Sequence, residues 1–396
     1  MQSTPKQMKR QINMEPLLYY IAFALIFIGA FIRTTLFYSL YAPLEYLMYA
    51  GYLLMFIKIV RYQRSNQTQL LVLVGIIGVA LLAGYLANNY IIMFSLAMVT
   101  TGAVNVPFRK IAKEYFWLAS ALLIVTIICS LTGVIENLQY TFEAERGVRN
   151  SFGIVYPTDF AAHVLFAMLS FIIAYEEKLN IIHSLAGIVI TVVVYLFCNT
   201  RVDCACMMIA WVGVPVIKLL QKKDIPCVLK KISAWICTFS MPAAAALMLV
   251  LSAVYNSSSP FLSRLNELLN GRLAFGKEGF ERYPVTLFGQ KVTLIGAGGS
   301  TTLREDYFFL DCSYMFCLMK YGVIITLLLI AAYVLVGMRH KHNGIMLLMI
   351  AITALNCMIA HHLPDIAYIV FTAFVFAADT GSDTPAEKET VAAEPV

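Results

Sequence analysis

Hydrophobic residues fall into runs of membrane-spanning length, separated by short polar connections. Most runs are about 17 to 25 residues long and lack the alternation of a barrel strand. Because a helix of that length crosses the hydrocarbon core, we predict an all-α, polytopic integral membrane protein. We expect about 12 transmembrane helices, near residues 16–32, 42–60, 70–86, 89–106, 115–135, 159–175, 180–198, 204–220, 232–254, 313–337, 344–360 and 366–378.

One long polar interval, residues 255–306, interrupts this pattern and is dense in Arg, Glu, Gly and Tyr. Long loops in compact proteins usually carry function, so chemistry or binding is expected here first. Ser259 and Pro260 predict the start of a short amphipathic helix that stops at Gly271. A second short helix is predicted to begin at Arg272 and to end before Pro284.

The composition excludes a soluble globule, because 60% of the 396 residues are hydrophobic and only 13% are charged. Mean hydropathy is +0.76. The net charge of +6 needs no nucleic acid to explain it, because cytoplasmic loops of membrane proteins are rich in Lys and Arg. The nine cysteines show no metal-ligand spacing, so we expect no bound metal. The apolar composition makes the lipid bilayer the expected partner.

The basic residues also predict an orientation. Twelve of the 29 Lys and Arg residues lie in four connections that alternate correctly with twelve spans, and both termini are therefore expected in the cytoplasm. These connections are residues 61–69, 109–114, 218–231 and 339–341. We expect residues 1–378 to form one membrane domain with extracytoplasmic loops at 136–158 and 255–306, and residues 379–396 to form a disordered cytoplasmic tail.

Seven arginines fall on the predicted outer face, which the charge rule disfavours for basic residues. They are Arg146, Arg149, Arg201, Arg264, Arg272, Arg282 and Arg304. Long translocated loops largely escape the rule, which explains the last four without any function. Arg201 lies in a short connection, where a charge near hydrocarbon costs ~1 kcal/mol or more. It is either a snorkelling anchor or a bidentate clamp on phosphate.

Four polar features beside or inside predicted spans have two interpretations each. The loop from Arg149 to Pro157 is a simple turn or one wall of a site. Asp311 is a helix N-cap or a general base facing the loop. His361 and His362 favour an interfacial position over a ligating one. Lys320, inside an apolar run, is expected to snorkel or to pair across helices.

Four segments in order resemble the integral membrane polysaccharide polymerases of the O-antigen and capsule type (Wzy-like), which are related to O-antigen ligases. They are RNSFGIVYPTDFA at 149–161, NTRVD at 199–203, LNELLNGRLAFGKEGFERYPVTLFGQ at 265–290 and LDCSYMFCLMKYGVI at 310–324. The third is the most specific. The chain departs from the family in having Thr158 where Asn is usual, and Asp311 with Cys312 where the ligases carry His and Asn.

The resemblance implies a glycosyltransferase of the GT-C membrane class, acting at the outer face of a bacterial cell membrane. Such an enzyme joins undecaprenyl-diphosphate-linked oligosaccharide repeat units during capsule, exopolysaccharide or O-antigen synthesis. It needs no cofactor, metal or nucleotide sugar, and its implied partners are a flippase and a chain-length regulator of the same pathway. The implied catalytic residues are Asp311 and Arg272. The implied substrate-binding residues are Arg149, Arg201, Arg282, Tyr156 and Arg264.

Two other functions remain as alternatives. One is a transporter or flippase of lipid-linked repeat units, and the other is an O-antigen ligase-type transferase. Transporters keep their ionisable groups near mid-membrane and have short loops, whereas the polar residues here lie mainly outside the predicted spans. This distribution favours an outer-face enzyme.

Overall fold

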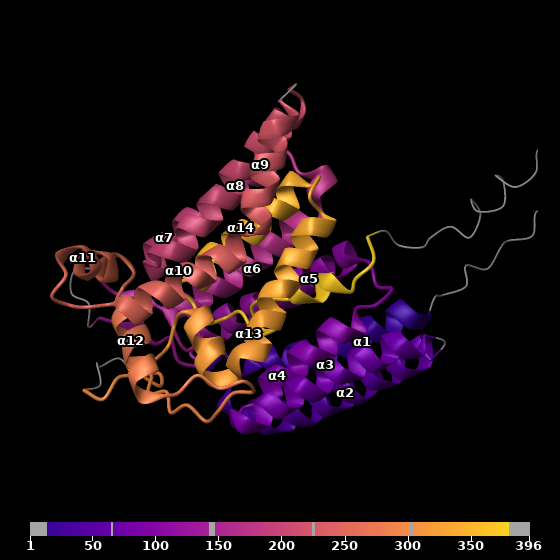
Figure 1. Cartoon of the computed structure of the whole chain (residues 1–396), viewed down its shortest axis with the longest axis horizontal. Coiled ribbons are helices and arrows are strands. Elements are labelled where there is room, and N and C mark those ends of the chain that lie inside the picture. Colours follow the sequence, from indigo (N-terminus) through magenta and orange to yellow (C-terminus); the bar gives the residue numbers. More distant parts are fainter. Residues whose placement is uncertain (1–13, 65, 142–146, 224–225, 301–304, 380–396) are drawn as a thin grey trace, which may run out of the picture.

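The computed structural model describes residues 14–64, 66–141, 147–223, 226–300 and 305–379 (Figure 1). The described part is a helical bundle, with one two-residue strand pair formed by β1 (Gln139–Tyr140) and β2 (Arg149–Asn150). The long helices are α1 (Met14–Ile32), α2 (Tyr41–Gln63), α3 (Gln67–Leu86), α5 (Phe108–Leu131), α6 (Pro157–Ala174), α7 (Ile181–Cys198), α8 (Arg201–Gln221) and α13 (Ser313–Arg339). The shorter helices are α4 (Tyr90–Gly102), α9 (Cys227–Thr238), α10 (Ser240–Val254), α11 (Pro260–Leu268), α12 (Arg272–Arg282) and α14 (Gly344–Cys357).

Eight helices of the described chain are long and apolar enough to cross a membrane. The count is nine if α9 and α10, which meet at an angle of 50°, form one broken span. A multi-pass membrane protein is therefore confirmed, but the expected twelve spans are not. The helices α4 and α14 match predicted spans but have only 13 and 14 residues.

The twelfth predicted span, residues 366–378, is not an α-helix, so that prediction is wrong. It contains turns and a short 3₁₀ helix, η4 (Phe371–Val375). The Asp365 carboxylate accepts a hydrogen bond from the Ala367 N–H at 2.9 Å. Such local side-chain bonds compete with helical ones. The Tyr115 hydroxyl from α5 also donates to the carbonyls of Ala367 and Tyr368.

This non-helical segment nevertheless runs the whole length of the bundle. At one end, the Ser313 N–H donates to the Ala360 carbonyl at 3.2 Å. At the other, Arg339 pairs with Asp379 at 2.9 Å. Because Ser313 and Arg339 are the first and last residues of α13, the chain between Ala360 and Asp379 passes along that helix from end to end. Apolar composition predicted the burial of this segment but not its backbone conformation.

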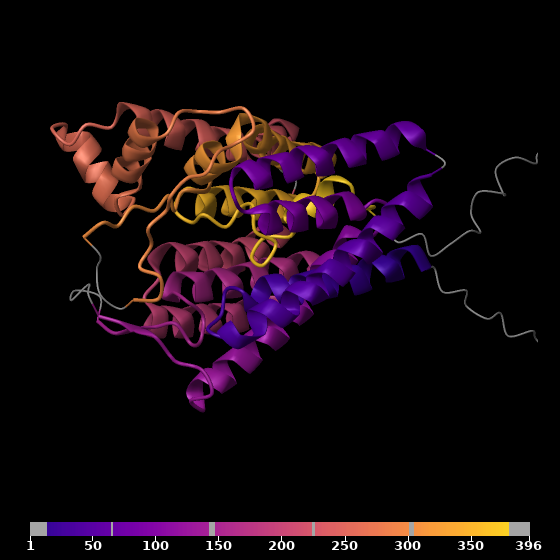
Figure 2. The ribbon, with the colours of Figure 1, turned by 90° about the horizontal axis from the view of Figure 1, so that it is seen from below.

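The two ends of the bundle differ in their connections. The loop segments 132–141, 147–156, 255–300 and 305–312 lie at one end, which we call the loop end, and α11 and α12 project there (Figures 1 and 2). At the opposite end, Glu176 accepts hydrogen bonds from Arg109 at 2.8 Å, Asn343 at 2.9 Å and Lys218 at 2.7 Å. Three of the four basic connections that predict the orientation therefore lie together at the end opposite the loop end. They are the connections that begin at Arg109, Lys218 and Arg339.

The core contains an aromatic stripe along α1. Tyr19, Phe23, Phe27 and Phe31 follow at a spacing of four residues, which places them on one helical face, and all are fully buried. Phe27 meets Tyr115 of α5 edge to face, with ring centroids 5.0 Å apart. The aromatic face of α1 thereby joins the helices α1–α4 to the rest of the bundle.

The long loop contains both predicted short helices. Ser259 caps α11 through its side chain, and Pro260 occupies the first turn. Between the helices, Asn270 and Gly271 have left-handed φ angles of 49° and 83°, which end the first helix. The predictions of α11 and α12 are confirmed with their boundaries.

The long loop also enters a break in α13. Gly322 has φ 83° and ψ 176°, which interrupts the helix. The neighbouring backbone groups find partners in the loop instead: Gln290 N–H donates to the Lys320 carbonyl at 3.0 Å, and Val323 N–H donates to the Thr286 carbonyl at 3.0 Å. Non-helical backbone at this depth is stable because another segment supplies its hydrogen bonds.

Replacing Gly322 with alanine is expected to destabilise the protein. Its backbone conformation is essentially restricted to glycine, with a strain of about 1–3 kcal/mol for other residues. An added Cβ would also lie 2.4 Å from the nitrogen of Gly289 and 2.6 Å from the carbonyl oxygen of Leu287. Thermal unfolding in detergent should show a clear fall in Tm. Gly75→Ala in α3 is the control, since its Cβ would meet no atom within 4 Å, and an equal Tm for both variants would contradict the docked loop.

Candidate functional site

Acidic residues mark the start of three helices at the loop end. Asp159 and Asp203 are the third residues of α6 and α8, and Asp311 lies two residues before α13. Asp159 interacts electrostatically with both other carboxylates. Acids are favourable at helix N-termini, where the helix dipole is positive. The fold therefore gathers carboxylates from distant parts of the chain at one end of the bundle.

Arg272 is held on three sides at the start of α12. Its Nη1 donates to the Asn270 carbonyl at 2.7 Å and its Nε to the Ile359 carbonyl at 3.3 Å. Its Nη2 pairs with Asp311 Oδ2 at 2.9 Å. Each side chain of this pair is 19% exposed. The pair is thus oriented by the fold and still open to a ligand.

His361 and His362 extend this arrangement toward α6. His361 Nδ1 lies 3.8 Å from the second oxygen of Asp311, and His362 Nε2 lies 3.6 Å from Asp159. The rings of the two histidines are 4.7 Å apart. We call these five residues, Arg272, Asp311, His361, His362 and Asp159, the polar cluster.

His362 is buried rather than interfacial, which corrects the sequence-based interpretation. It is 2% exposed. Its ring stacks on the ring of Tyr368, with centroids 3.8 Å apart. The ring of His163 also stacks on Tyr368, with centroids 4.1 Å apart. His163 Nε2 in turn lies 2.8 Å from the Thr34 hydroxyl. The stacked rings of His362, Tyr368 and His163 therefore form a row, a file of polar rings, that leads from the polar cluster into the bundle.

Two further polar contacts support the loop end. Asn356 of α14 donates to Asp203 at 2.8 Å, with both residues buried. Arg149 is also buried and donates from Nε to the Cys198 carbonyl at 3.0 Å. The charges of Arg149 and Arg272 both act on Asp203. Arg149 is therefore a buried residue whose charge acts on Asp203, and it does not lie on the surface.

Tyr156 joins the two loops at this end. It is the N-cap residue of α6, and its hydroxyl accepts hydrogen bonds from the backbone of Gly298 and Gly299 in the long loop. Burial raises the pKa of Tyr156 and the pKa of Tyr307 above their usual value. Both phenols therefore remain protonated at neutral pH and able to donate.

Three of the predicted arginines lie at the edge of the site. Arg264 pairs with Glu267 at 2.9 Å on α11, where its side chain is 77% exposed. Arg282 pairs with Glu278 and stacks over the Phe308 ring at 4.4 Å. Arg201 is exposed at the first turn of α8. The structure thus pairs Arg272 with Asp311 and places Tyr156 within electrostatic reach of Asp311, whereas Arg149 contacts Cys198. Arg146 and Arg304 lie outside the described residues.

The chemistry of the polar cluster combines a fixed cation with a carboxylate and a neutral imidazole. Burial lowers the pKa of His361, and the charges of Lys320 and Arg272 act in the same direction, while Asp311 opposes them. The imidazole is therefore neutral at pH 7. Among the described residues, no group of three or more His, Cys, Asp or Glu could hold a metal ion. The guanidinium can bind an anion while the carboxylate accepts a proton.

Sequence reasoning did not find Asn356, His163 or Tyr368. Asn356 lies in an apolar run 153 positions from its partner Asp203, so no local pattern indicates the contact. His163 had a weak signal, since it follows Asp159 by four residues and lies on the same face of α6.

Comparisons with protein-family models, with curated proteins and with solved structures find no match to this chain. The site geometry and the four sequence segments are therefore the basis for a functional proposal.

Proposed function

We propose that the chain is a Wzy-like polysaccharide polymerase that joins undecaprenyl-diphosphate-linked oligosaccharide repeat units. The observation that carries the proposal is the ion pair of Arg272 with Asp311, 2.9 Å apart and partly exposed at the loop end. The two residues come from two of the four segments that resemble the polymerase family. A transferase for diphosphate-linked sugars needs a cation for the leaving group and a base for the acceptor.

In the proposed reaction, a hydroxyl oxygen of the acceptor sugar bonds to the anomeric carbon of the donor glycan. The bond from that carbon to the diphosphate oxygen breaks at the same time. The hydroxyl proton passes to the Asp311 carboxylate, and the electron pair leaves with the lipid diphosphate. Arg272 stabilises the developing charge, and a hydrogen bond of this kind contributes about 1.5–3 kcal/mol. Arg149, whose charge acts on Asp203, would add positive potential to the site.

The proposed location is the extracytoplasmic face of a bacterial cell membrane. Support comes from the charge pattern, because basic connections cluster at the end opposite the polar cluster. A GT-C type of architecture, with a flippase and a chain-length regulator as pathway partners, belongs to the same proposal. Arg201, Arg264 and Arg282 would then contact the glycan at the edge of the site.

A transporter or flippase of lipid-linked repeat units is the second candidate, and one observation favours it. His362, Tyr368 and His163 form their file of rings inside the bundle, and intramembrane ionisable residues mark transport pathways in many carriers. An O-antigen ligase-type transferase would use the same site with a different acceptor.

Deleting the gene in its native host separates these functions. The measurement is the mass of the lipid-linked glycans and their accessibility to an external glycosidase. Single repeats that accumulate facing outward are the result expected for a polymerase. Single repeats facing inward would indicate a flippase, and full-length polymer stranded on its lipid would indicate a ligase; either result would overturn the proposal.

A further inference from the structure

A hollow opens between the first turn of α7 and the last two turns of α8, two helices that lie side by side in Figure 1. It is at the end of the bundle opposite the loop end. Its volume is about 300 Å³, within the range of pockets that hold small ligands. The buried part of its lining consists of Leu179, Ser184 and Val214. We call this hollow the α7–α8 pocket.

Two lysines of α8 give the pocket a positive side. Lys218 and Lys222 both line it, and a spacing of four residues places them on one face of the helix. The Lys218 ammonium donates to the backbone carbonyls of Glu176 and Leu179, both at 2.7 Å. Neither bond neutralises its charge, and an ammonium group has a third hydrogen to donate. The charge of Lys218 therefore remains available to an anion.

The carboxylates at this end of the bundle bind a different cation. Arg109 pairs with Glu176 at 2.8 Å and with Glu177 at 3.3 Å. Within the described ranges, neither Lys218 nor Lys222 forms an ion pair with a carboxylate. A ligand with a negative group would therefore balance the charge of the pocket.

The rim of the pocket is apolar and exposed. Ile181 and Leu219 line it with exposed fractions of 59% and 57%. Ile182 and Leu185 of α7 are also exposed. Both helices are long and apolar enough to cross a membrane, so these side chains face hydrocarbon close to its boundary. The pocket thus suits a ligand that has a charged head and a hydrocarbon tail.

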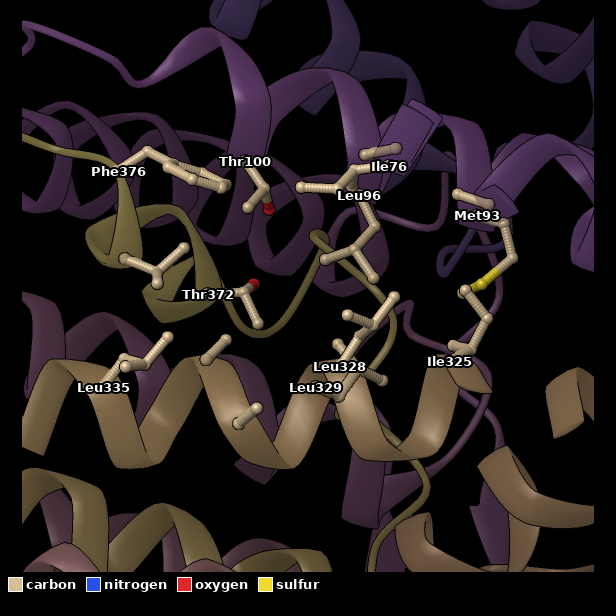
Figure 3. A pocket seen from close by; sticks show the side chains of 15 residues that line it. Ile76, Met93, Leu96, Thr100, Ile325, Leu328, Leu329, Leu335, Thr372 and Phe376 are labelled. Carbon is tan, nitrogen blue, oxygen red and sulfur yellow. The ribbon is translucent and has the colours of Figure 1, made fainter. Parts of the chain in front are cut away.

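Another hollow, between α3, α4, α13 and η4, lacks this combination (Figure 3). The polar side chains in its lining are Thr100 and Thr372, and no charged residue of the described chain lines it. It offers hydrocarbon contacts but no counter-ion for a phosphate group. The α7–α8 pocket is therefore the stronger candidate for an anionic ligand.

We propose that the α7–α8 pocket binds an anionic phospholipid, with its phosphate group at Lys218 and Lys222 and one acyl chain along the exposed apolar face of α7. The predicted orientation places this end in the cytoplasmic leaflet, where lysines attract anionic lipids. A soluble phosphate could contact the lysines but would leave the apolar rim uncovered. The inference goes beyond the proposed function and does not depend on it, because the pocket lies at the opposite end of the bundle from the polar cluster.

The test uses the full-length protein in phosphatidylcholine nanodiscs that contain a trace of photoreactive phosphatidylglycerol. Labelled peptides are expected from the start of α7 and the end of α8. Unlabelled phosphatidylglycerol should compete for this label, whereas added phosphatidylcholine and soluble glycerol phosphate should not. Lys222→Gln should reduce the label about fivefold, the factor expected for one lysine near an anionic headgroup. Lys222→Arg keeps the charge and should retain the label.

Thermal unfolding gives a second measurement of the same binding. Phosphatidylglycerol should raise the Tm of the wild-type protein, because a ligand that binds the folded state stabilises it. The increase should be smaller in Lys222→Gln. Since the Lys222 side chain is exposed, the substitution itself should not prevent folding.

Lys223→Gln is the matched control, because Lys223 is the next residue along the chain, is exposed and does not line the pocket. Its label and its increase in Tm should match those of the wild type. An unchanged label in Lys222→Gln, or equal losses in the two variants, would overturn the inference. Equal competition by phosphatidylcholine would overturn it too, since the contact would then be ordinary lipid packing. Equal competition by glycerol phosphate would do the same, since the pocket would then bind a soluble anion.

Discussion

Arg272→Ala is expected to abolish polymer formation without affecting membrane insertion. The guanidinium would bind the departing diphosphate, and each charge-assisted hydrogen bond contributes about 1.5–3 kcal/mol. Losing one such bond slows transfer roughly 10- to 100-fold, and losing two multiplies the effect. The measurement is the chain-length distribution of the glycan in a deletion strain that carries the variant. Arg272→Lys should recover only part of the activity, because an ammonium group lacks the bidentate geometry.

Lys277→Ala is the matched control for Arg272. Lys277 lies on the same helix, α12, but its side chain contacts Glu281 at 3.8 Å and donates to the Ala253 carbonyl at 3.2 Å. Polymer in this variant should match that of the wild type. Wild-type chain lengths in Arg272→Ala, with normal amounts of protein in the membrane, would show that the arginine is not part of the site.

Asp311→Asn is expected to reduce the rate of glycosyl transfer by about 100- to 10,000-fold, the usual contribution of a general base. The substitution keeps the size of the side chain but removes the proton acceptor and the ion pair with Arg272. The measurement is a single-turnover assay with a lipid-linked repeat unit as donor and acceptor.

Glu281→Gln, an exposed acid on α12, is the control and should leave the rate unchanged. The double variant Arg272→Ala with Asp311→Asn tests whether the two residues act together. If they do, its loss should be smaller than the product of the single losses. A loss below about tenfold in Asp311→Asn would assign the base to another residue.

Most of the helical architecture could be predicted from sequence because a bilayer leaves a chain few options. An apolar run such as the predicted span 180–198 must form a helix there, and the structure places α7 at Ile181–Cys198. The short helices α11 and α12 were also predictable, because Pro260 and Gly271 are strong start and stop signals. Both kinds of prediction rest on local chemistry.

The site was predictable only in part, since its contacts are not local. The resemblance placed Arg272 and Asp311 in the site, and the structure brings them within 2.9 Å. Nothing in the sequence indicated that Asn356 would meet Asp203 across 153 positions. The non-helical form of 366–378 was equally hidden, because hydropathy measures burial in an apolar medium and cannot say whether lipid or protein surrounds the segment.

The non-helical crossing between Ala360 and Asp379 constrains how the protein can be assembled during synthesis. A helix enters the bilayer alone because it satisfies its own backbone, but this segment depends on donors and acceptors from other helices, such as the Tyr115 hydroxyl of α5. It therefore has to enter a slot formed by helices that are already in place. The segment between Ala360 and Asp379 therefore completes the packing of the bundle last. A chain that ends after α14 would leave the surfaces of α5 and α13 that contact this segment uncovered.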